Sequence, residues 1–325
     1  MGWRDRLNGL PRPEPFELTE AATLVLLSPF VLAPAPVEAL AARAVVAWQF
    51  REGAWTRNRR LVKFPPELAA HWPSSALAIA RASEADSMQE RIRLLRGAVF
   101  PWWRRRLRLI GLGHVRAGLE GGNGVILWVQ RCTQSNVAVK QALWQADYPL
   151  AHLSRPGHPF SGRPFGMRWI NPLLRRAELR FLAERVVIEN STIPALRRLR
   201  ALLAENRVVS ITVAPEATRR EEMALLGGWL ALPHGPVQLA VASGAALLPV
   251  FTYGRKDRTY VEIGAPLPVT GPGRDEVRGT LTASRDWLER RVTEHPEAWI
   301  GWRTREYRID GQGAAAEPLA FDSGG

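Results

Sequence analysis

Apolar and amphipathic stretches alternate along the middle of the chain, between residues 125 and 264. Short runs rich in β-branched and aliphatic residues predict buried strands, and stretches whose leucines recur every three or four positions predict helices. The predicted strands lie near residues 125–129, 148–153, 207–213, 246–253 and 259–264, and the predicted helices near 192–206, 235–243 and 275–294. This order predicts an α/β fold with a central mixed sheet flanked by helices.

The chain before residue 116 lacks this alternation and predicts an N-terminal helical region. Residues 21–37 carry no charge, but Pro29, Pro34 and Pro36 would interrupt a helix that spans a membrane. We therefore favour a re-entrant or interfacial hairpin, ahead of a buried core helix and of a true span or cleaved signal. In residues 101–110, Trp102 and Trp103 lie on the apolar arc of a predicted helix beside arginines, which suits either a headgroup boundary or an ordinary surface helix.

Three regions follow from these patterns. Residues 1–115 form a predicted helical, membrane-facing region, residues 116–309 a predicted α/β domain, and residues 310–325 a Gly/Ala-rich tail predicted to be disordered.

Charge and cysteine content narrow the partners. The chain has 325 residues and a formal net charge of +13, which favours anionic membrane surfaces, nucleic acids or acidic carriers. Zinc spacing, an aromatic RNA-binding block and a separable basic recognition helix are all lacking, and the glycines at 118–124 precede a strand instead of following one. These features argue against a nucleic-acid binder and a dinucleotide enzyme. The single cysteine, Cys132, excludes internal disulfides and suits a reducing compartment.

Polar residues follow the predicted strand at 207–213. Glu216 and Arg219 come directly after it, where the carboxyl ends of strands in open α/β sheets bind ligands. A planar guanidinium at that edge suits a phosphate or carboxylate, although the two residues could also form an ion pair that closes a surface loop.

Several short motifs occur in a characteristic order. They are Pro215-Glu216-Ala217-Thr218-Arg219, then Gly235-Pro236, then Gly244 to Val250 with its Pro249, and finally Pro296-Glu297-Ala298-Trp299 with Trp302 and Arg303. This series resembles the glycerophosphate and lysophospholipid acyltransferase superfamily, and most closely its lipid A (Kdo-dependent) acyltransferase branch. The resemblance covers roughly residues 116–309.

The resemblance implies a reaction and its partners. A fatty acyl group would pass from a thioester, on acyl carrier protein or coenzyme A, to a hydroxyl of a lyso-lipid or glycolipid, with no cofactor or metal. Glu216, Thr218 and Arg219 would bind the acceptor, with Arg155 and Arg163 as weaker candidates for the same anionic group. We expect a peripheral or monotopic protein on the cytoplasmic face of the inner membrane, and no nucleic-acid partner.

The catalytic positions of the family are altered here. The family has a histidine followed five positions later by Asp or Glu, and the matching positions hold Arg131 and Asn136. Arginine stays protonated and asparagine carries no charge, so neither can act as the base or as its orienting acid. Three interpretations stay open: a lipid-binding relative without a base, another base such as His158 or His234, or Cys132 as a nucleophile.

Overall fold

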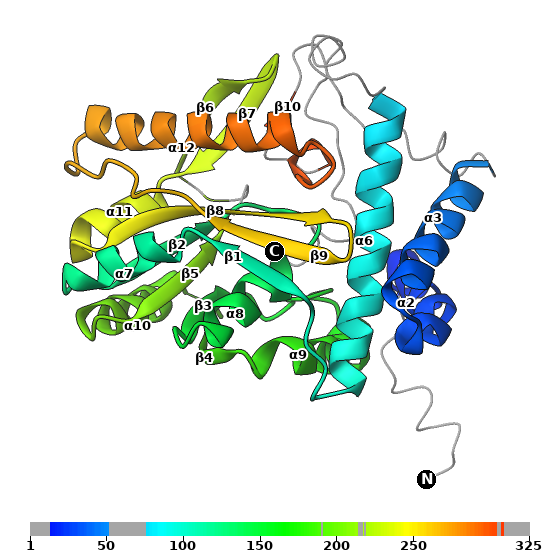
Figure 1. The fold of residues 1–325 in the computed structure, drawn as a ribbon. Coiled ribbons are helices and arrows are strands. Elements are labelled where there is room, and N and C mark those ends of the chain that lie inside the picture. The colour runs from blue at the N-terminus through cyan, green and yellow to red at the C-terminus, as the bar shows by residue number, and fades with distance from the viewer. Residues whose placement is uncertain are drawn as a thin grey trace.

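The computed structural model of the chain describes residues 14–51, 76–189, 191–213, 217, 219–303 and 307–308. A seven-stranded sheet lies at its centre, in the strand order β1-β9-β8-β2-β5-β3-β4 (Figure 1). The strands are β1 Leu107–Ile110, β2 Val125–Val129, β3 Leu150–Ser154, β4 Leu182–Val187, β5 Val208–Thr212, β8 Ala246–Arg255 and β9 Arg258–Ile263. All five predicted strands belong to this sheet.

The sheet is mixed, as predicted. Neighbouring strands from β8 to β4 pair in parallel, whereas β9 runs antiparallel to β8, and β1 pairs in parallel with β9. The carboxyl ends of β2, β3, β4, β5 and β8 therefore lie along one edge. The α/β class with a mixed sheet flanked by helices is confirmed.

Strand β2 shows why both faces of the sheet are covered. Ile126 and Trp128 join a core with the helices α10 (Thr192–Ala204), α11 (Gly235–Ser243) and α12 (Arg274–Glu294). The alternate residues Val125, Leu127 and Val129 pack instead with α7 (Leu112–Glu120) and α8 (Ser135–Gln145). Because side chains alternate between the faces of a strand, a fully apolar strand needs helices on both sides.

A small second sheet was not predicted. It consists of the hairpin β6 (Arg220–Leu225) and β7 (Gly228–Pro233) with the short strand β10 (Tyr307–Arg308). Leu226 and Gly227 form its turn with φ angles of 44° and 73°. A leucine is unusual at positive φ, so this turn lacks the Asn or Asp signal that identifies hairpins in a sequence.

The described residues of the N-terminal region are mostly helical, and they begin with a helix–turn–helix hairpin. Helix α2 (Pro15–Leu27) leads through the 3₁₀ turn η1 (Ser28–Leu32) into α3 (Ala35–Arg51), so the break falls at the prolines that predicted it. The hairpin packs on the long helix α6 (Ala76–Val99), which stands between α3 and the central sheet (Figure 1).

The predicted helix over residues 101–110 is wrong. Residues 107–110 form β1, which pairs with β9. Leu107 and Leu109 are half-buried, whereas the alternate residues Arg106 and Arg108 are exposed. This alternation, with a period of two residues, is typical of a strand. Strand β1 thus belongs to the sheet, although it precedes the predicted domain boundary at residues 115 and 116.

Candidate active site

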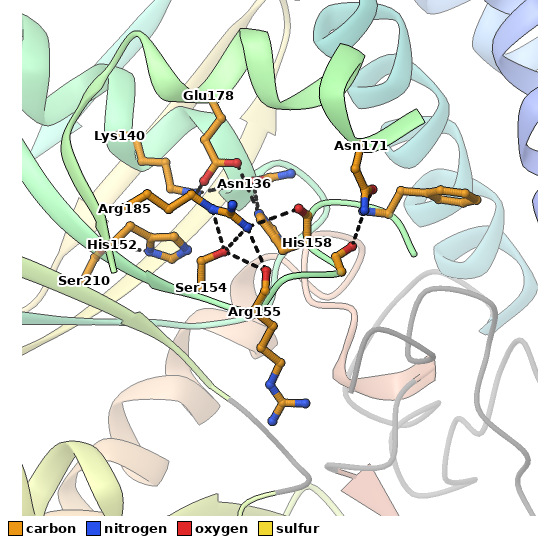
Figure 2. Close-up of polar contacts among 12 residues, drawn as sticks. Asn136, Lys140, His152, Ser154, Arg155, His158, Asn171, Glu178, Arg185 and Ser210 are labelled. Carbon is orange, nitrogen blue, oxygen red and sulfur yellow. Dashed lines mark hydrogen bonds and ion pairs between the residues drawn. The ribbon is translucent and has the colours of Figure 1, made fainter. Parts of the chain in front are cut away.

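Two connections meet at the carboxyl edge of the sheet, on either side of β5. After β2 the chain enters α8, whose first turn contains Asn136. After β3 a loop over residues 155–165 contains His158 and leads through η2 (Gly166–Ile170) into α9 (Asn171–Leu179). Figure 2 shows the polar side chains that gather where these connections meet.

His158 occupies the centre of this group. Its Nε2 lies 3.1 Å from Asn136 Oδ1 and 3.4 Å from Glu178 Oε2. Both neighbours are oxygen acceptors, which assigns the proton of a neutral imidazole to Nε2 and leaves Nδ1 unprotonated. The His158 side chain is 31% exposed and that of Glu178 only 1%. The imidazole therefore links a buried carboxylate to the accessible surface, as a general base with its orienting acid must.

Glu178 of α9 is held in its ionised form. Lys140 Nζ of α8 lies 2.6 Å from Glu178 Oε1, and both residues are buried. Burial alone would raise the pKa of Glu178, but the charges of Lys140 and His158 outweigh it and hold that pKa well below its ordinary value of 4.5. A fixed negative charge therefore lies behind His158 at neutral pH.

The backbone of the His158 loop is fastened from the sheet side by Arg185 of β4. The guanidinium donates to Ser154 Oγ from Nε and Nη2, at 3.1 and 2.9 Å, and to the Arg155 carbonyl oxygen at 2.7 Å. A longer contact of 3.4 Å reaches the His158 carbonyl oxygen (Figure 2). Arg185 thus fixes the start of the loop to the sheet.

Asn171, the first residue of α9, fastens the other half of the loop. Its Oδ1 accepts the Phe160 N–H at 3.0 Å, and its Nδ2 donates to the Gly157 and Ser161 carbonyl oxygens at 3.1 and 2.7 Å. Asn171 is fully buried. Since one side chain bonds the backbone on both sides of His158, the imidazole is held by a rigid support.

A second histidine, His152, lies next to His158 and is buried. It is buried in β3, with Nδ1 2.8 Å from Ser210 Oγ of β5. Burial, followed by the charge of Lys140, holds its pKa well below the ordinary 6.5. His152 is therefore neutral at physiological pH, and its ring forms part of the wall behind His158, with the ring centroids 6.0 Å apart.

The donor atoms of His152, His158 and Glu178 lie close enough together to consider a metal ion, within 4.8 Å of one another. Two-histidine-one-carboxylate sets bind transition metals. Here, however, Lys140 already occupies Glu178 Oε1, and Arg185 adds a second fixed positive charge to the group (Figure 2). These cations repel a divalent ion, so the group does not fit a metal site.

The structure brings Asn136 and His158 together. The predicted substrate residues Arg155 and Arg163, and Arg131 at the altered catalytic position, have other surroundings. The Arg155 side chain points away from the cluster (Figure 2). Arg163 is exposed and donates its backbone N–H to Ser161 Oγ at 3.0 Å. Arg131 is half-buried, and its carbonyl oxygen accepts the Ile300 N–H at 3.0 Å.

The other predicted residues have different surroundings. Cys132 is buried in the main core and forms a β-bridge with Trp299, which favours a structural role for its thiol. His234 is the N-cap residue of α11, and its Nε2 lies 3.8 Å from Glu221 Oε2. Arg219 is exposed, and its carbonyl oxygen accepts the His234 N–H at 3.0 Å. Glu216 and Thr218 lie outside the described residues, so their predicted place in the cleft stays a prediction.

Sequence reasoning missed Glu178, Lys140 and Arg185. Glu178 lies on the buried stripe of α9, seven residues after Asn171 and four after Leu174. A carboxylate at the helical spacing of core residues must have a buried partner, and that spacing is the signal that could have identified it.

No protein-family model matches this chain, and no curated protein matches it significantly. The geometry of the site and the sequence motifs are therefore what indicate a function for this chain.

Proposed function

We propose that the protein transfers a fatty acyl group from an acyl thioester to a hydroxyl of a lyso-lipid or glycolipid, with His158 as the general base. The thioester is carried by acyl carrier protein or coenzyme A. The observation that carries the proposal is the contact of His158 Nε2 with Asn136 and Glu178 at the carboxyl edge of the sheet. It supplies a base and an orienting carboxylate although Arg131 and Asn136 occupy the positions where the family has them.

Each residue has a defined part in this reaction. Nδ1 of His158 takes the proton of the acceptor hydroxyl while the hydroxyl oxygen attacks the thioester carbonyl. When the C–S bond breaks, the same proton passes from Nδ1 to the leaving thiolate. Glu178 stabilises the imidazolium that exists in between, and Asn136 fixes the tautomer by accepting the Nε2 proton. The exposed Arg163 and Arg219 are available for an anionic headgroup.

The outer face of the N-terminal hairpin supports a lipid acceptor. Helix α2 buries the acidic side chains Glu17 and Glu20, which are 0% and 8% exposed, together with Leu24 and Leu27. Its other aliphatic side chains point outward, and the most exposed of them is Val25, at 72%. Leu32 of η1 and Leu40 of α3 are also exposed. A surface helix of a protein that meets only water has the reverse arrangement.

Lipid is the environment that fits this face. The stretch Pro15–Leu32 is long and apolar enough to cross a membrane by length and composition alone, with 28% of it buried. Arg43 of α3 and Arg168 of η2 are exposed cations, and the Arg168 guanidinium lies 5.4 Å from the Trp169 ring. Tryptophan beside arginine suits an anionic headgroup layer, so the hairpin docks on the cytoplasmic face of the membrane.

The deciding experiment supplies long-chain acyl thioesters of acyl carrier protein and of coenzyme A with a panel of lyso-lipid and glycolipid acceptors. Thiol release and product mass are followed together. His158→Ala should lower the rate by about 10²–10⁴-fold, because it removes the general base. The matched control is His234→Ala, which removes a different histidine that also lies near a glutamate.

The outcomes separate the three interpretations. Turnover that survives in His158→Ala but not in His234→Ala or Cys132→Ser would place the reacting group elsewhere. Lipid binding without product in any variant would mark a catalytically silent relative that binds lipid, and would refute the proposed reaction.

A further inference from the structure

We infer that the N-terminal hairpin clamps the His158 loop through Glu17, so that docking of the hairpin on a lipid bilayer stabilises the geometry of the active site. The inference rests on the proposed function for the role of His158 and for the lipid face. The clamp itself rests on contacts between α2 and the loop.

Glu17 is the centre of the clamp. It is fully buried, although it lies on the first turn of α2. Its Oε1 accepts the Ser161 hydroxyl at 2.8 Å and the Gly166 N–H at 2.9 Å. Its Oε2 accepts the Glu14 N–H at 3.0 Å. One carboxylate thus joins the start of the hairpin to the last part of the loop that contains His158.

Apolar packing supports the same connection. The rings of Phe16 and Phe160 have centroids 6.1 Å apart. Leu24 of α2 and Val31 of η1 share a core cluster with Phe160 and with residues of η2 and α9. The inward face of the hairpin is therefore part of the support of the loop, while its outward face is the one proposed to meet lipid.

The contact passes to His158 over a short length of chain. Ser161 lies three residues after His158, and Asn171 bonds the backbone at Gly157, Phe160 and Ser161 together. A shift of Ser161 would therefore move the backbone on both sides of the imidazole and lengthen the contacts of Nε2.

A second buried carboxylate ties the hairpin to the other connection of the site. Glu38 of α3 is 1% exposed, and its Oε1 accepts from Arg93 Nε of α6 at 2.7 Å. The same guanidinium donates from Nη1 to Gln134 Oε1 at 3.1 Å. Gln134 lies two residues before Asn136. Asn136 and Glu178, the two contacts of His158 Nε2, thus lie on α8 and α9, and each of these helices is held by the hairpin or by residues that contact it.

Lipid docking and loop order are coupled by mass action. A ligand that binds only the closed, packed hairpin lowers the population of its locally opened forms. Because Glu17 is shared, opening of α2 releases Ser161 and Gly166 at the same time. A bilayer therefore protects the loop without touching it.

Hydrogen exchange of peptides covering residues 157–166 tests the clamp on the full chain. The probe is a vesicle of phosphatidylglycerol and phosphatidylethanolamine, with phosphatidylcholine vesicles as the uncharged comparison. In the wild type, the anionic vesicles should slow exchange of the loop on the order of tenfold. The double variant Val25→Gln/Leu26→Gln alters only exposed side chains and should lose both vesicle binding and this protection.

Glu17→Ala is compared with Glu20→Ala, because the two buried carboxylates lie on the same helix and only Glu17 contacts the loop. Glu20 bonds Arg91 of α6 instead. Glu17→Ala should bind vesicles but exchange its loop amides roughly 10–100-fold faster than the wild type, with vesicles present or absent. Glu20→Ala should keep the effect of vesicles on the loop. Ser161→Ala removes the contact from the loop side, if Glu17→Ala does not fold.

Three results would overturn the inference. They are a wild type that does not bind the vesicles, loop exchange that is equal with and without bound vesicles, and protection that survives in Glu17→Ala or, where that variant does not fold, in Ser161→Ala. Acyl transfer is assayed in parallel. If vesicles protect the loop through Glu17 but no acyl transfer occurs, only the proposed function is refuted. If acyl transfer occurs but vesicles do not protect the loop, only the clamp is refuted.

Discussion

At the scale of single residues, the site depends on a buried carboxylate that two basic groups share. Glu178 contacts Lys140 through one oxygen and His158 through the other. Taking these charges out of water is expensive, and only their mutual attraction offsets the loss of hydration. The pair Lys140–Glu178 is therefore best understood as a support that keeps a negative charge behind His158, and less as a source of stability.

Removing either partner of this pair should destabilise the protein strongly. Glu178→Gln leaves the Lys140 ammonium buried without a counter-charge, which we expect to lower the free energy of unfolding by about 3–5 kcal/mol. The double variant Lys140→Met/Glu178→Gln removes both charges. Its loss of unfolding free energy should be smaller than the summed losses of Lys140→Met and Glu178→Gln. Urea unfolding at neutral pH measures the cycle, and strictly additive losses would contradict the shared burial.

The stability that Glu178 contributes should depend on pH in the acidic range. The folded pKa of Glu178 is depressed, so the stability it contributes is fully present above the unfolded pKa of about 4.5 and is lost as the pH falls through the lower folded value. The difference in unfolding free energy between wild type and Glu178→Gln should therefore narrow as the pH drops below 4.5. A difference that stays constant over that range would show that Glu178 is not ionised in the folded protein.

At the scale of elements, tertiary contacts decided what the sequence could not. Strands β2 and β5 and helix α11 are predictable because each is a short apolar stretch with a Gly or Pro residue near one end. Strand β1 resembles a helix in the sequence because its apolar residues and the two tryptophans before it fit one helical arc, and only pairing with β9 selects the strand. Sequence reasoning named His158 and Asn136, but their meeting depends on the β5 strand between them, which no local pattern encodes.

Glycines on two elements should respond oppositely to the same substitution. A Cβ at Gly166 of η2 would lie 2.5 Å from Ser161 Cβ and 2.8 Å from Glu17 Oε1, so Gly166→Ala must push the loop away from α2. Gly279 is exposed on the second turn of α12, and no atom lies within 4 Å of such a Cβ there. Gly279→Ala should therefore stabilise the protein by roughly 0.5–1 kcal/mol, since glycine is a poor helix former.

Thermal unfolding and loop exchange measure this pair. Gly166→Ala should speed exchange over residues 157–166 and slow any acyl transfer, whereas Gly279→Ala should raise the melting temperature and leave both unchanged. Equal effects of the two substitutions would mean that the space around Gly166 is not restrictive.

At the scale of the whole molecule, distant parts of the chain meet at Gln134. Its Oε1 accepts from Arg93 of the N-terminal region and from the Thr259 hydroxyl of β9. Asp86 of α6 also bonds Gln134 and faces Glu297 of the closing Pro296-Glu297-Ala298-Trp299 motif. The predicted regions 1–115 and 116–309 are therefore joined by a polar network beside the candidate site.

Asp86 should make this junction sensitive to pH. Burial, and then the charge of Glu297, raise its pKa from 3.8 to about 7, while Arg93 and the hydrogen bond from Gln134 partly oppose the shift. A carboxyl whose folded pKa is raised contributes stability below its unfolded pKa and loses it as the pH rises through the folded value. Asp86→Asn keeps the size of the side chain without the charge. The variant should therefore gain stability relative to the wild type between pH 3.8 and about 7 and hold that gain above it. Urea unfolding over this pH series measures the difference, with Glu84→Gln on the same helix as the control. If the stability difference between Asp86→Asn and the wild type does not grow with pH over this range, burial does not raise the pKa of Asp86 in the folded protein.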